Sequence, residues 1–369
     1  ETDMPANDRH RSDDELAAAG MTIAIHARER PNDLALKCAN GDTRTWKELN
    51  DRSNQLAHAL RKAGLRDGDA VALLAHNAAE FVEVWAACQR SGLRLTPINW
   101  HQSASIVAYI IDNCDAKALF SSARFGDLVK DLPATESKVK VRICFAAAMQ
   151  GYTDFEDFIR NEPKAAPPAP SMGSYMLYTS GTTGRPKGVH RPVRPAASQL
   201  TATILETAAF QPAKDVTLVT GPLYHAAPLA LNLVTPLNAG VCCVLMDKWD
   251  AEEILRLVQD ERITHTHVVP TMFHRLLQLP EATRRKYDVS TLRWILHGAA
   301  PCHITGSKTR GVSTTERKGL TRDRDADVNA HHAARCVLGN IPRHCTMGGK
   351  DRCRIAVVVW ILQRHRLFE

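Results

Sequence analysis

The chain has 369 residues, of which 44% are hydrophobic and 24% charged, and its formal net charge is +7. This length exceeds what one core usually serves and predicts two or more lobes. No apolar run is long enough for a membrane span, and the sequence starts with polar and acidic residues where a signal peptide would be apolar, so we expect a cytoplasmic protein.

The basic excess invites a nucleic-acid function, but its position argues against one. Residues 1–302 are neutral overall, and the whole excess lies in residues 303–369, where aspartates interrupt the basic run and aromatic residues are nearly absent. We therefore expect no nucleic-acid partner. The ten cysteines show no framework of short repeated spacings, so we also expect free thiols.

The first hundred residues alternate helical and extended signals. Thr45 and Glu48 have the spacing of a capping box and predict the start of a helix. An apolar run at 70–75 predicts a strand, Asn77 is placed to cap a second helix, and 93–99 predicts another strand. This order is typical of a parallel sheet covered by helices.

Two segments divide the chain by their composition. Residues 1–19 are polar and are expected to be disordered, and the Pro/Ala-rich residues 161–171 predict an extended connector between subdomains. Beyond the connector the alternation resumes, and we expect strands at 217–222, 264–270 and 292–298 and an amphipathic helix at 251–263. The sequence thus predicts an α/β protein.

A glycine-rich segment, Tyr178–Val189 (YTSGTTGRPKGV), follows the connector. Backbone N–H groups exposed by glycines, several hydroxyls and one ammonium group together suit an oligophosphate. Gly181 and Gly184 allow the backbone to approach a bulky anion, and Lys187 adds a positive charge. These residues predict a phosphate-binding loop.

The segment differs from the usual P-loop, in which Gly precedes the lysine and Ser or Thr follows it. Here Pro186 precedes Lys187 and Gly188 follows it. A flexible Gly/Ser/Thr linker is the alternative interpretation. The strand-like SYMLYT that leads into the segment, and the proline beside the lysine, favour the phosphate-binding interpretation.

The glycine-rich segment resembles the signature loop of the adenylate-forming superfamily, which includes acyl-CoA synthetases, luciferases and peptide-synthetase adenylation domains. Other stretches agree with the family in order and spacing, and the resemblance extends over about residues 20–302. It is greatest to the fatty-acyl-CoA synthetases. The stretches are the helix and strand region 45–99, GPLYHAAP (221–228), ITHTHVVPTMF (263–273) and LRWILHGAAPC (292–302).

The resemblance implies a multi-subdomain N-terminal domain with mixed and parallel sheets flanked by helices. It also implies a two-step reaction. A small carboxylic acid, here a fatty acid, and ATP with Mg²⁺ give an acyl-adenylate and pyrophosphate. Coenzyme A then displaces AMP to give a thioester.

The resemblance assigns site residues in three places. His225 would lie beside the acyl-adenylate as the candidate catalytic residue, although an ordinary loop histidine is the alternative. Thr182 would also lie near Mg²⁺, and Lys187 would support the loop. The residues implied to contact the β and γ phosphates are Thr179, Ser180, Gly181, Thr182, Thr183 and Gly184, and those implied to lie against adenine are Gly298, Ala299, Ala300 and Pro301.

His265 and His267 alternate with apolar residues on one predicted strand and therefore share a face. A metal-binding pair is one interpretation of this spacing. We favour a pair that lies in the core or at a cleft.

The family pattern ends at about Cys302. The tail, 303–369, lacks a segment of the Tyr-Gly-x-Thr-Glu type, a Gly-Asp pair and a C-terminal domain with the adenylation lysine. We therefore predict that the C-terminal domain is absent and that 303–369 is a non-homologous, disordered tail, and a reading-frame shift would explain the abrupt change. A zinc site in the tail lacks a recognised ligand spacing.

These observations predict an ATP-dependent acyl-CoA synthetase, an acid–thiol ligase. Two alternatives stay open: a non-catalytic remnant that binds a nucleotide, an acyl chain or a partner, and an acyl-AMP ligase that stops at the adenylate. The sequence leaves the acyl chain length and the oligomeric state open.

Overall fold

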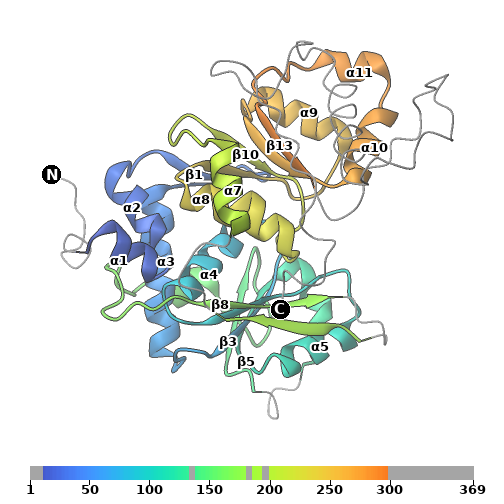
Figure 1. Ribbon diagram of the computed structural model, residues 1–369. Helices are drawn as coiled ribbons and strands as arrows, with labels where there is room; N and C mark the ends of the chain where they lie inside the picture. The colour runs from blue at the N-terminus through green and yellow to red at the C-terminus, as the bar shows by residue number, and fades with distance from the viewer. Residues whose placement is uncertain (1–10, 133–137, 180–184, 193–198, 298–369) are drawn as a thin grey trace, which may run out of the picture. The chain divides into compact units, whose positions relative to one another are not determined.

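The structure is a computed structural model that describes residues 11–132, 138–179, 185–192 and 199–297 (Figure 1). Two compact units are distinguished: unit 1 is Glu1–Ala197 with Pro222–Leu229, and unit 2 is Ser198–Gly221 with Ala230–Glu369. The segment Pro222–Leu229 therefore belongs to unit 1, although the chain on both sides of it belongs to unit 2.

Unit 1 contains a seven-stranded sheet in the order β7-β6-β5-β3-β4-β8-β9. All neighbouring strands are parallel except β8 and β9, which form an antiparallel pair. The strands are β3 (Ala70–Leu74), β4 (Arg94–Pro97), β5 (Ala116–Ser122), β6 (Val141–Phe145), β7 (Thr153–Asp154), β8 (Ser174–Thr179) and β9 (Lys187–Arg191). Unit 1 also contains β1 (Leu34–Cys38) and β2 (Thr43–Thr45), which pair in antiparallel orientation outside the seven-stranded sheet.

Helices pack against this sheet because its strands are apolar on both sides, as expected of a buried parallel sheet. Ala72 and Leu74 of β3 share one core cluster with Ile110 and Ile111 of helix α5. The alternate residues of β3 are equally buried, and α4 contacts β3 and β4. The helices of unit 1 are α1 (Asp13–Ala18), α2 (Thr22–Glu29), α3 (Trp46–Lys62), α4 (Ala79–Gln89), α5 (Ala104–Asn113), the 3₁₀ helix η1 (Ala123–Leu128) and α6 (Phe155–Ile159).

Unit 2 contains four parallel strands in the order β13-β12-β10-β11. Helices α9 and α10 share a core cluster with residues of all four strands, while α7 packs with Trp294 and Leu296 of β13. The elements are α7 (Gln199–Ala208), β10 (Val216–Val219), α8 (Thr235–Asn238), β11 (Cys242–Leu245), α9 (Ala251–Asp260), β12 (His265–Val268), α10 (Pro270–Gln278), α11 (Glu281–Lys286) and β13 (Trp294–His297), and a π-helix, η2 (Pro228–Val234), begins in the segment that belongs to unit 1.

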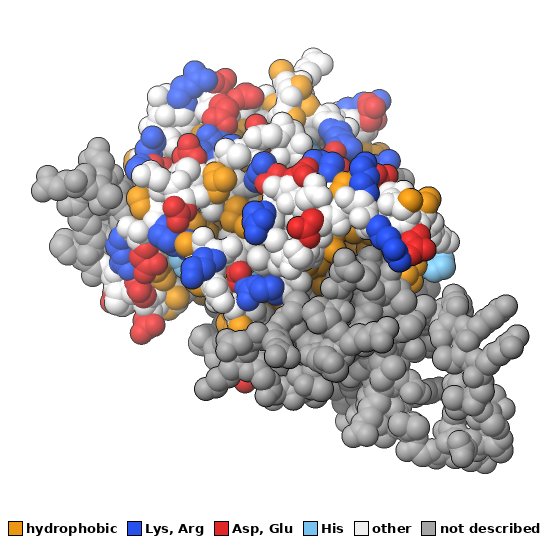
Figure 2. Space-filling model, turned by 90° about the horizontal axis from the view of Figure 1, so that it is seen from above, with side chains coloured by type: hydrophobic (Ala, Val, Ile, Leu, Met, Phe, Trp, Pro, Cys, Tyr) orange, Lys and Arg blue, Asp and Glu red, His pale blue; other side chains and the backbone are white. Residues whose placement is uncertain are grey.

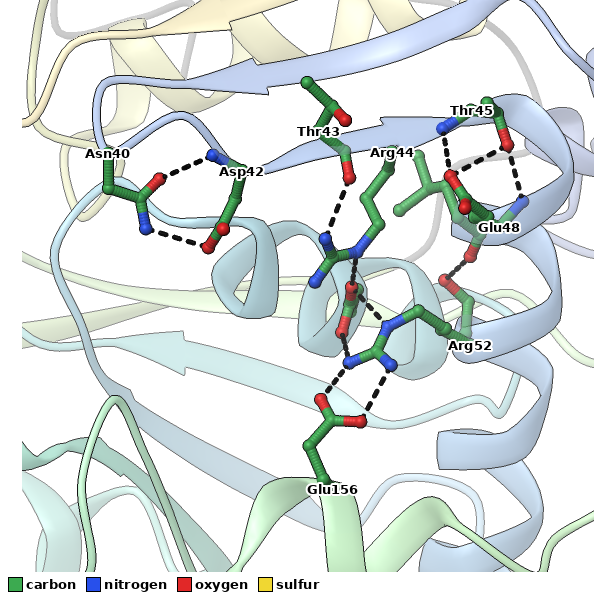
Figure 3. Close-up of polar contacts among 11 residues, drawn as sticks. Asn40, Asp42, Thr43, Arg44, Thr45, Glu48, Arg52 and Glu156 are labelled. Carbon is green, nitrogen blue, oxygen red and sulfur yellow. Dashed lines mark hydrogen bonds and ion pairs between the residues drawn. The ribbon is translucent and has the colours of Figure 1, made fainter.

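A polar network joins four elements of unit 1 (Figure 3). The carboxylate of Glu83, on α4, is fully buried and accepts hydrogen bonds from Arg44 of β2 at 2.7 Å and from Arg52 of α3 at 2.7 and 3.0 Å. Arg52 also donates to Glu156 of α6 at 3.0 Å. The two arginines supply the partners that a buried carboxylate requires.

Two predictions about the ends of elements have different outcomes. The capping box is confirmed, because Thr45 caps α3 and the Glu48 side chain accepts from the Thr45 backbone N–H at 2.8 Å. The helix cap at Asn77 is wrong. Helix α4 has Ala78 at its N-cap, with no side-chain cap, because the side-chain oxygen of Asn77 accepts instead from Leu223.

The expectation of disorder over residues 1–19 is wrong for 13–18, which form α1. Ser12 and Glu15 make a capping box there, and Leu16 is buried. Residues 1–10 lie outside the described residues.

The connector at 161–171 contains no helix, but both of its flanks belong to unit 1, so it does not separate two units. Asn54 and His58 of α3 hydrogen bond its backbone carbonyls at Lys164 (2.8 Å) and Ala165 (2.9 Å). The segment is therefore fixed along α3.

The predicted α/β class, with parallel and mixed sheets flanked by helices, is confirmed. No helix in the described ranges is long and apolar enough to cross a membrane. On the face seen in Figure 2, the basic side chains of the described residues are interspersed with acidic ones.

Candidate functional site

The candidate site is built at one edge of the unit 1 sheet. In a parallel sheet the loops that follow the carboxyl ends of the strands lie at the same edge, and this edge is where open α/β sheets bind ligands. Neighbouring strands β5, β3, β4 and β8 all run in the same direction. The predicted phosphate-binding residues begin at the carboxyl end of β8.

The glycine-rich segment connects β8 to β9 as a hairpin. Tyr178 faces Gly188 across the two strands, and Thr179 faces Lys187, so the strands continue into both ends of the segment. Sequence inspection missed β9. The centre of the segment lies outside the described residues, and with it lie five of the predicted phosphate contacts: Ser180, Gly181, Thr182, Thr183 and Gly184.

The two described phosphate candidates, Thr179 and Lys187, are both exposed at the end of this hairpin. The Thr179 hydroxyl makes one long hydrogen bond, of 3.5 Å, to the carbonyl oxygen of Lys187. Lys187 forms no ion pair with any residue that the structure describes.

His225 lies at the same edge, because loops from neighbouring strands hold the segment Pro222–Leu229. The Asn77 side chain, after β3, accepts a hydrogen bond from the Leu223 N–H at 3.0 Å. Trp100, after β4, meets the buried ring of Tyr224 edge-on, with ring centroids 5.8 Å apart. Phe125, after β5, stacks on Trp100 with centroids 5.2 Å apart. Three adjacent strands thus fix the backbone that carries His225.

The imidazole of His225 packs beside Tyr224, with ring centroids 4.5 Å apart. Desolvation of the ring by its surroundings, followed by the charge of His101, lowers the pKa of His225 below 6.5. Burial also raises the pKa of Tyr224 to about 12. At neutral pH both side chains are uncharged, so His225 is able to donate and to accept a hydrogen bond.

The predicted adenine segment follows β13 in unit 2, and its residues Gly298, Ala299, Ala300 and Pro301 lie outside the described residues. His297, the last residue of β13, pairs in register with Val268 at the end of β12. Of the predicted site residues that are described, Thr179 and Lys187 pair across the hairpin, and His225 belongs to the same unit 1.

His265 and His267 are both buried in unit 2. His265 lies 2.9 Å from the carbonyl oxygen of Ala208 through Nε2 and 2.8 Å from the Thr264 hydroxyl through Nδ1, as a satisfied core histidine does. Within the described ranges, no three His, Cys, Asp or Glu side chains are grouped to hold a metal ion.

Sequence reasoning missed Asn77, Trp100 and Phe125 as supports of His225. Each follows directly after a strand of the unit 1 sheet. For Asn77 and Trp100 the available signal was their position just beyond the strands predicted at 70–75 and 93–99, because such positions converge at one edge of a parallel sheet. Phe125 follows β5, which the sequence analysis did not predict.

Comparisons with known proteins identify the family of the chain. A family model described as AMP-binding enzyme matches residues 23–308, and the chain belongs to this family of adenylate-forming enzymes. Over 292 residues it is 32% identical to a fatty acid–[acyl-carrier-protein] ligase, ScoC, from Streptomyces coeruleorubidus, which covers 78% of this chain and 54% of that protein.

Two further proteins are similar to this chain over a comparable length. A feruloyl-CoA synthase from an Amycolatopsis species is 30% identical over 298 residues, covering 80% of this chain and 57% of that protein. The crystal structure of ATP-bound MatB from Rhodopseudomonas palustris matches with a TM-score of 0.65 and 26% identity, covering 77% of this chain and 55% of that chain. This chain thus spans about half the length of the relatives it matches.

Proposed function

We propose that the protein acts as an ATP-dependent acid–thiol ligase, which joins a carboxylic acid to ATP as an acyl-adenylate and then transfers the acyl group to a thiol. The observation that carries this proposal is the placement of the glycine-rich hairpin and His225 at one edge of the unit 1 sheet, in a chain of the AMP-binding family. The cytoplasm as its location is part of the same proposal.

The chemical problem in the first step is electrostatic, because an anionic carboxylate must approach the α-phosphate of a polyanionic nucleotide. We propose that Lys187 and Thr179, both exposed and at the same hairpin end, contact the terminal phosphates together with the residues between them. These contacts would offset the negative charge of the terminal phosphates and so reduce their repulsion of the carboxylate. We propose that Mg²⁺ enters with the phosphates, with the Thr182 hydroxyl beside it.

His225 has the properties needed beside a reacting carboxylate. A neutral imidazole on a fixed backbone donates a hydrogen bond to an acyl oxygen without adding a fixed charge. We propose that it orients the acid for attack. The adenine would lie against Gly298, Ala299, Ala300 and Pro301, where small side chains leave room for a flat ring.

For the acid we propose a fatty acid, and for the thiol coenzyme A. The resemblance of the sequence to fatty-acyl-CoA synthetases supports this choice, and so does the name of the Streptomyces relative, a fatty acid ligase. The names of the relatives differ in the acid and in the carrier of the thiol. Ferulate is therefore the natural competitor in a test.

The test is acid-dependent exchange of labelled pyrophosphate into ATP by the purified chain. We expect exchange with fatty acids, weaker exchange with ferulate, and none without an acid. Addition of coenzyme A should release AMP and form a thioester. His225→Ala should reduce the exchange rate by about 10²-fold or more, as is typical when a fixed hydrogen-bond donor to the reacting group is removed.

Each other outcome selects a different function. Exchange without thioester formation would identify an acyl-AMP ligase. A folded preparation that binds ATP or an acyl-adenylate analogue in a thermal-shift titration, yet shows no exchange with any acid, would identify a binding protein without activity. If it binds neither nucleotide nor analogue, the proposal is wrong.

A further inference from the structure

Helix α5 contacts both arms of the glycine-rich hairpin, through Tyr178 on β8 and Arg185 just before β9. Tyr109 and Asn113 are four residues apart on α5 and therefore lie on the same face of the helix. The Tyr178 hydroxyl, on β8, donates a hydrogen bond to the Asn113 side-chain oxygen at 2.6 Å. The guanidinium of Arg185, just before β9, lies over the Tyr109 ring at 5.4 Å from its centroid.

The absence of a side chain at Gly188 leaves space for the Tyr178 ring, which makes the hydrogen bond to Asn113. Gly188 faces Tyr178 across the strand pair, and a Cβ atom there would lie 2.3 Å from the Met176 methyl group and 3.0 Å from Cζ of the Tyr178 ring. A side chain at this position would require the Met176 methyl group to move and would press on the ring that reaches Asn113. Gly188, although part of the glycine-rich segment, thus makes room for Tyr178 and lies outside the residues assigned to phosphate.

Helix α5 is itself held rigidly. Ile110 and Ile111, on the turn between the two contacting residues, are buried in the core cluster of unit 1, against which Tyr109 and Tyr178 also pack. Ser103 caps the start of the helix through a hydrogen bond to the Ile106 N–H. A contact with α5 therefore fixes a residue relative to the sheet.

We propose that Tyr109 and Asn113 form an anchor that holds the two ends of the hairpin, at Tyr178 and Arg185, in the spacing required to bind nucleotide phosphates. They are positioning residues, since they act through the hairpin. This inference rests on the proposed function for its effect on ATP, whereas the anchor itself is defined by contacts within unit 1.

The anchor is tested with the double variant Tyr109→Leu/Asn113→Ala, which removes both contacts and keeps residues of helical propensity. Tyr109→Phe is the conservative variant, because it keeps the aromatic face under Arg185. Asp112→Ala is the matched control, because Asp112 is an exposed residue of the same helix. Circular dichroism establishes that each variant is folded.

The first measurement is hydrogen exchange of the strand amides at 177–179 and 187–189, which needs no ligand. We expect the double variant to exchange faster at these amides, while Tyr109→Phe and Asp112→Ala exchange as the wild type does. The second is ATP binding with Mg²⁺ by equilibrium dialysis. We expect the dissociation constant of the double variant to rise by up to about fivefold to seventyfold, the range for losing one hydrogen bond and one exposed cation–π contact.

Unchanged exchange in the double variant would overturn the anchor. Faster exchange with an unchanged dissociation constant for ATP would overturn its positioning role. If the wild type binds no ATP, the proposed function fails, and the exchange data alone decide whether the anchor exists. An equal loss of affinity in Asp112→Ala would show that any change in α5 has this effect and would also overturn the inference.

Discussion

Asn77 is the residue that most directly fixes the segment bearing His225. Its side-chain oxygen accepts a hydrogen bond from the Leu223 N–H at 3.0 Å, and both residues are buried. Asn77→Ala leaves this N–H without its acceptor, which costs about 1–3 kcal/mol. We therefore expect faster hydrogen exchange at Leu223 and a fall in pyrophosphate exchange of about fivefold or more, measured in the same preparation.

The control for Asn77 is Asn40→Ala, because Asn40 is an exposed loop residue whose side chain hydrogen bonds its near neighbour Asp42. This variant should keep the wild-type rates of both pyrophosphate exchange and hydrogen exchange at Leu223. Normal activity in Asn77→Ala together with faster exchange at Leu223 would show that the position of this backbone does not limit the reaction.

His267 makes stability depend on pH. It is buried, and its Nε2 has no hydrogen-bond partner in the described structure. Burial, followed by the charge of His297, lowers its pKa to about 4 from 6.5. Between these values the unfolded chain binds the proton and the folded chain does not, so stability falls as pH falls, by up to about 1.4 kcal/mol per pH unit.

We therefore expect His267→Leu to lose less stability than the wild type when urea unfolding is measured at pH 7 and again at pH 4.5. The loss of unfolding free energy between pH 7 and pH 4.5 should be about 2–3 kcal/mol greater in the wild type than in His267→Leu. His274→Leu is the control, because His274 is an exposed residue of α10. The same loss of stability in His267→Leu and in the wild type would show that another group causes the dependence.

At the scale of elements, Glu83 joins α4 to β2 and α3. Its side chain is fully buried between Arg44 and Arg52, which are themselves mostly covered, with side-chain exposures of 17% and 19%. Glu83→Ala leaves two guanidinium groups without this partner, and breaking a buried ion pair in this way costs about 3–5 kcal/mol. The free energy of unfolding in urea, at an unchanged m-value, measures the loss.

Glu156→Ala serves as the comparison for Glu83. The Glu156 side chain is 56% exposed and contacts only Arg52 of the pair, so its removal should cost about 1 kcal/mol or less. Equal losses for the two variants would mean that burial of Glu83 adds nothing to the strength of the network.

The elements that could be predicted are those that local pattern determines. The apolar run at 70–75 became β3, and the capping box at Thr45 opened α3, because both depend on neighbouring residues alone. The cap at Asn77 failed because its acceptor is used by Leu223, 146 residues away. β9 was missed because its sequence, KGVHR, is polar and forms a strand only through pairing with β8.

At the scale of the whole molecule, the motifs predicted the family, while the support of the site came only from the fold. Order and spacing of motifs sufficed to identify an adenylate-forming chain, and the family model confirms it. No local pattern indicates that Pro222–Leu229 belongs to unit 1 while the residues around it belong to unit 2. The hydrogen bond that Asn77 accepts from Leu223 and the contact between the Trp100 and Tyr224 rings place it there.

A site that holds the terminal phosphates should stabilise the folded protein more with ATP than with AMP. A ligand at 100 times its dissociation constant adds about 2.7 kcal/mol to the free energy of unfolding. AMP lacks the β and γ phosphates, which are the groups assigned to the glycine-rich segment, so at equal concentration it should add less. Thermal unfolding with Mg²⁺ and each nucleotide measures the difference.

A variant of Lys187 tests whether the extra stabilisation by ATP arises at the glycine-rich segment. Lys187 is exposed and pairs in register with Thr179. Lys187→Ala should reduce the stabilisation by ATP and leave that by AMP nearly unchanged, because the proposal assigns its charge to the terminal phosphates alone. Lys214→Ala, an exposed lysine of unit 2, should change neither. Equal stabilisation by ATP and AMP in the wild type would mean that the segment does not hold the terminal phosphates, since the nucleoside monophosphate would then account for all of the binding energy.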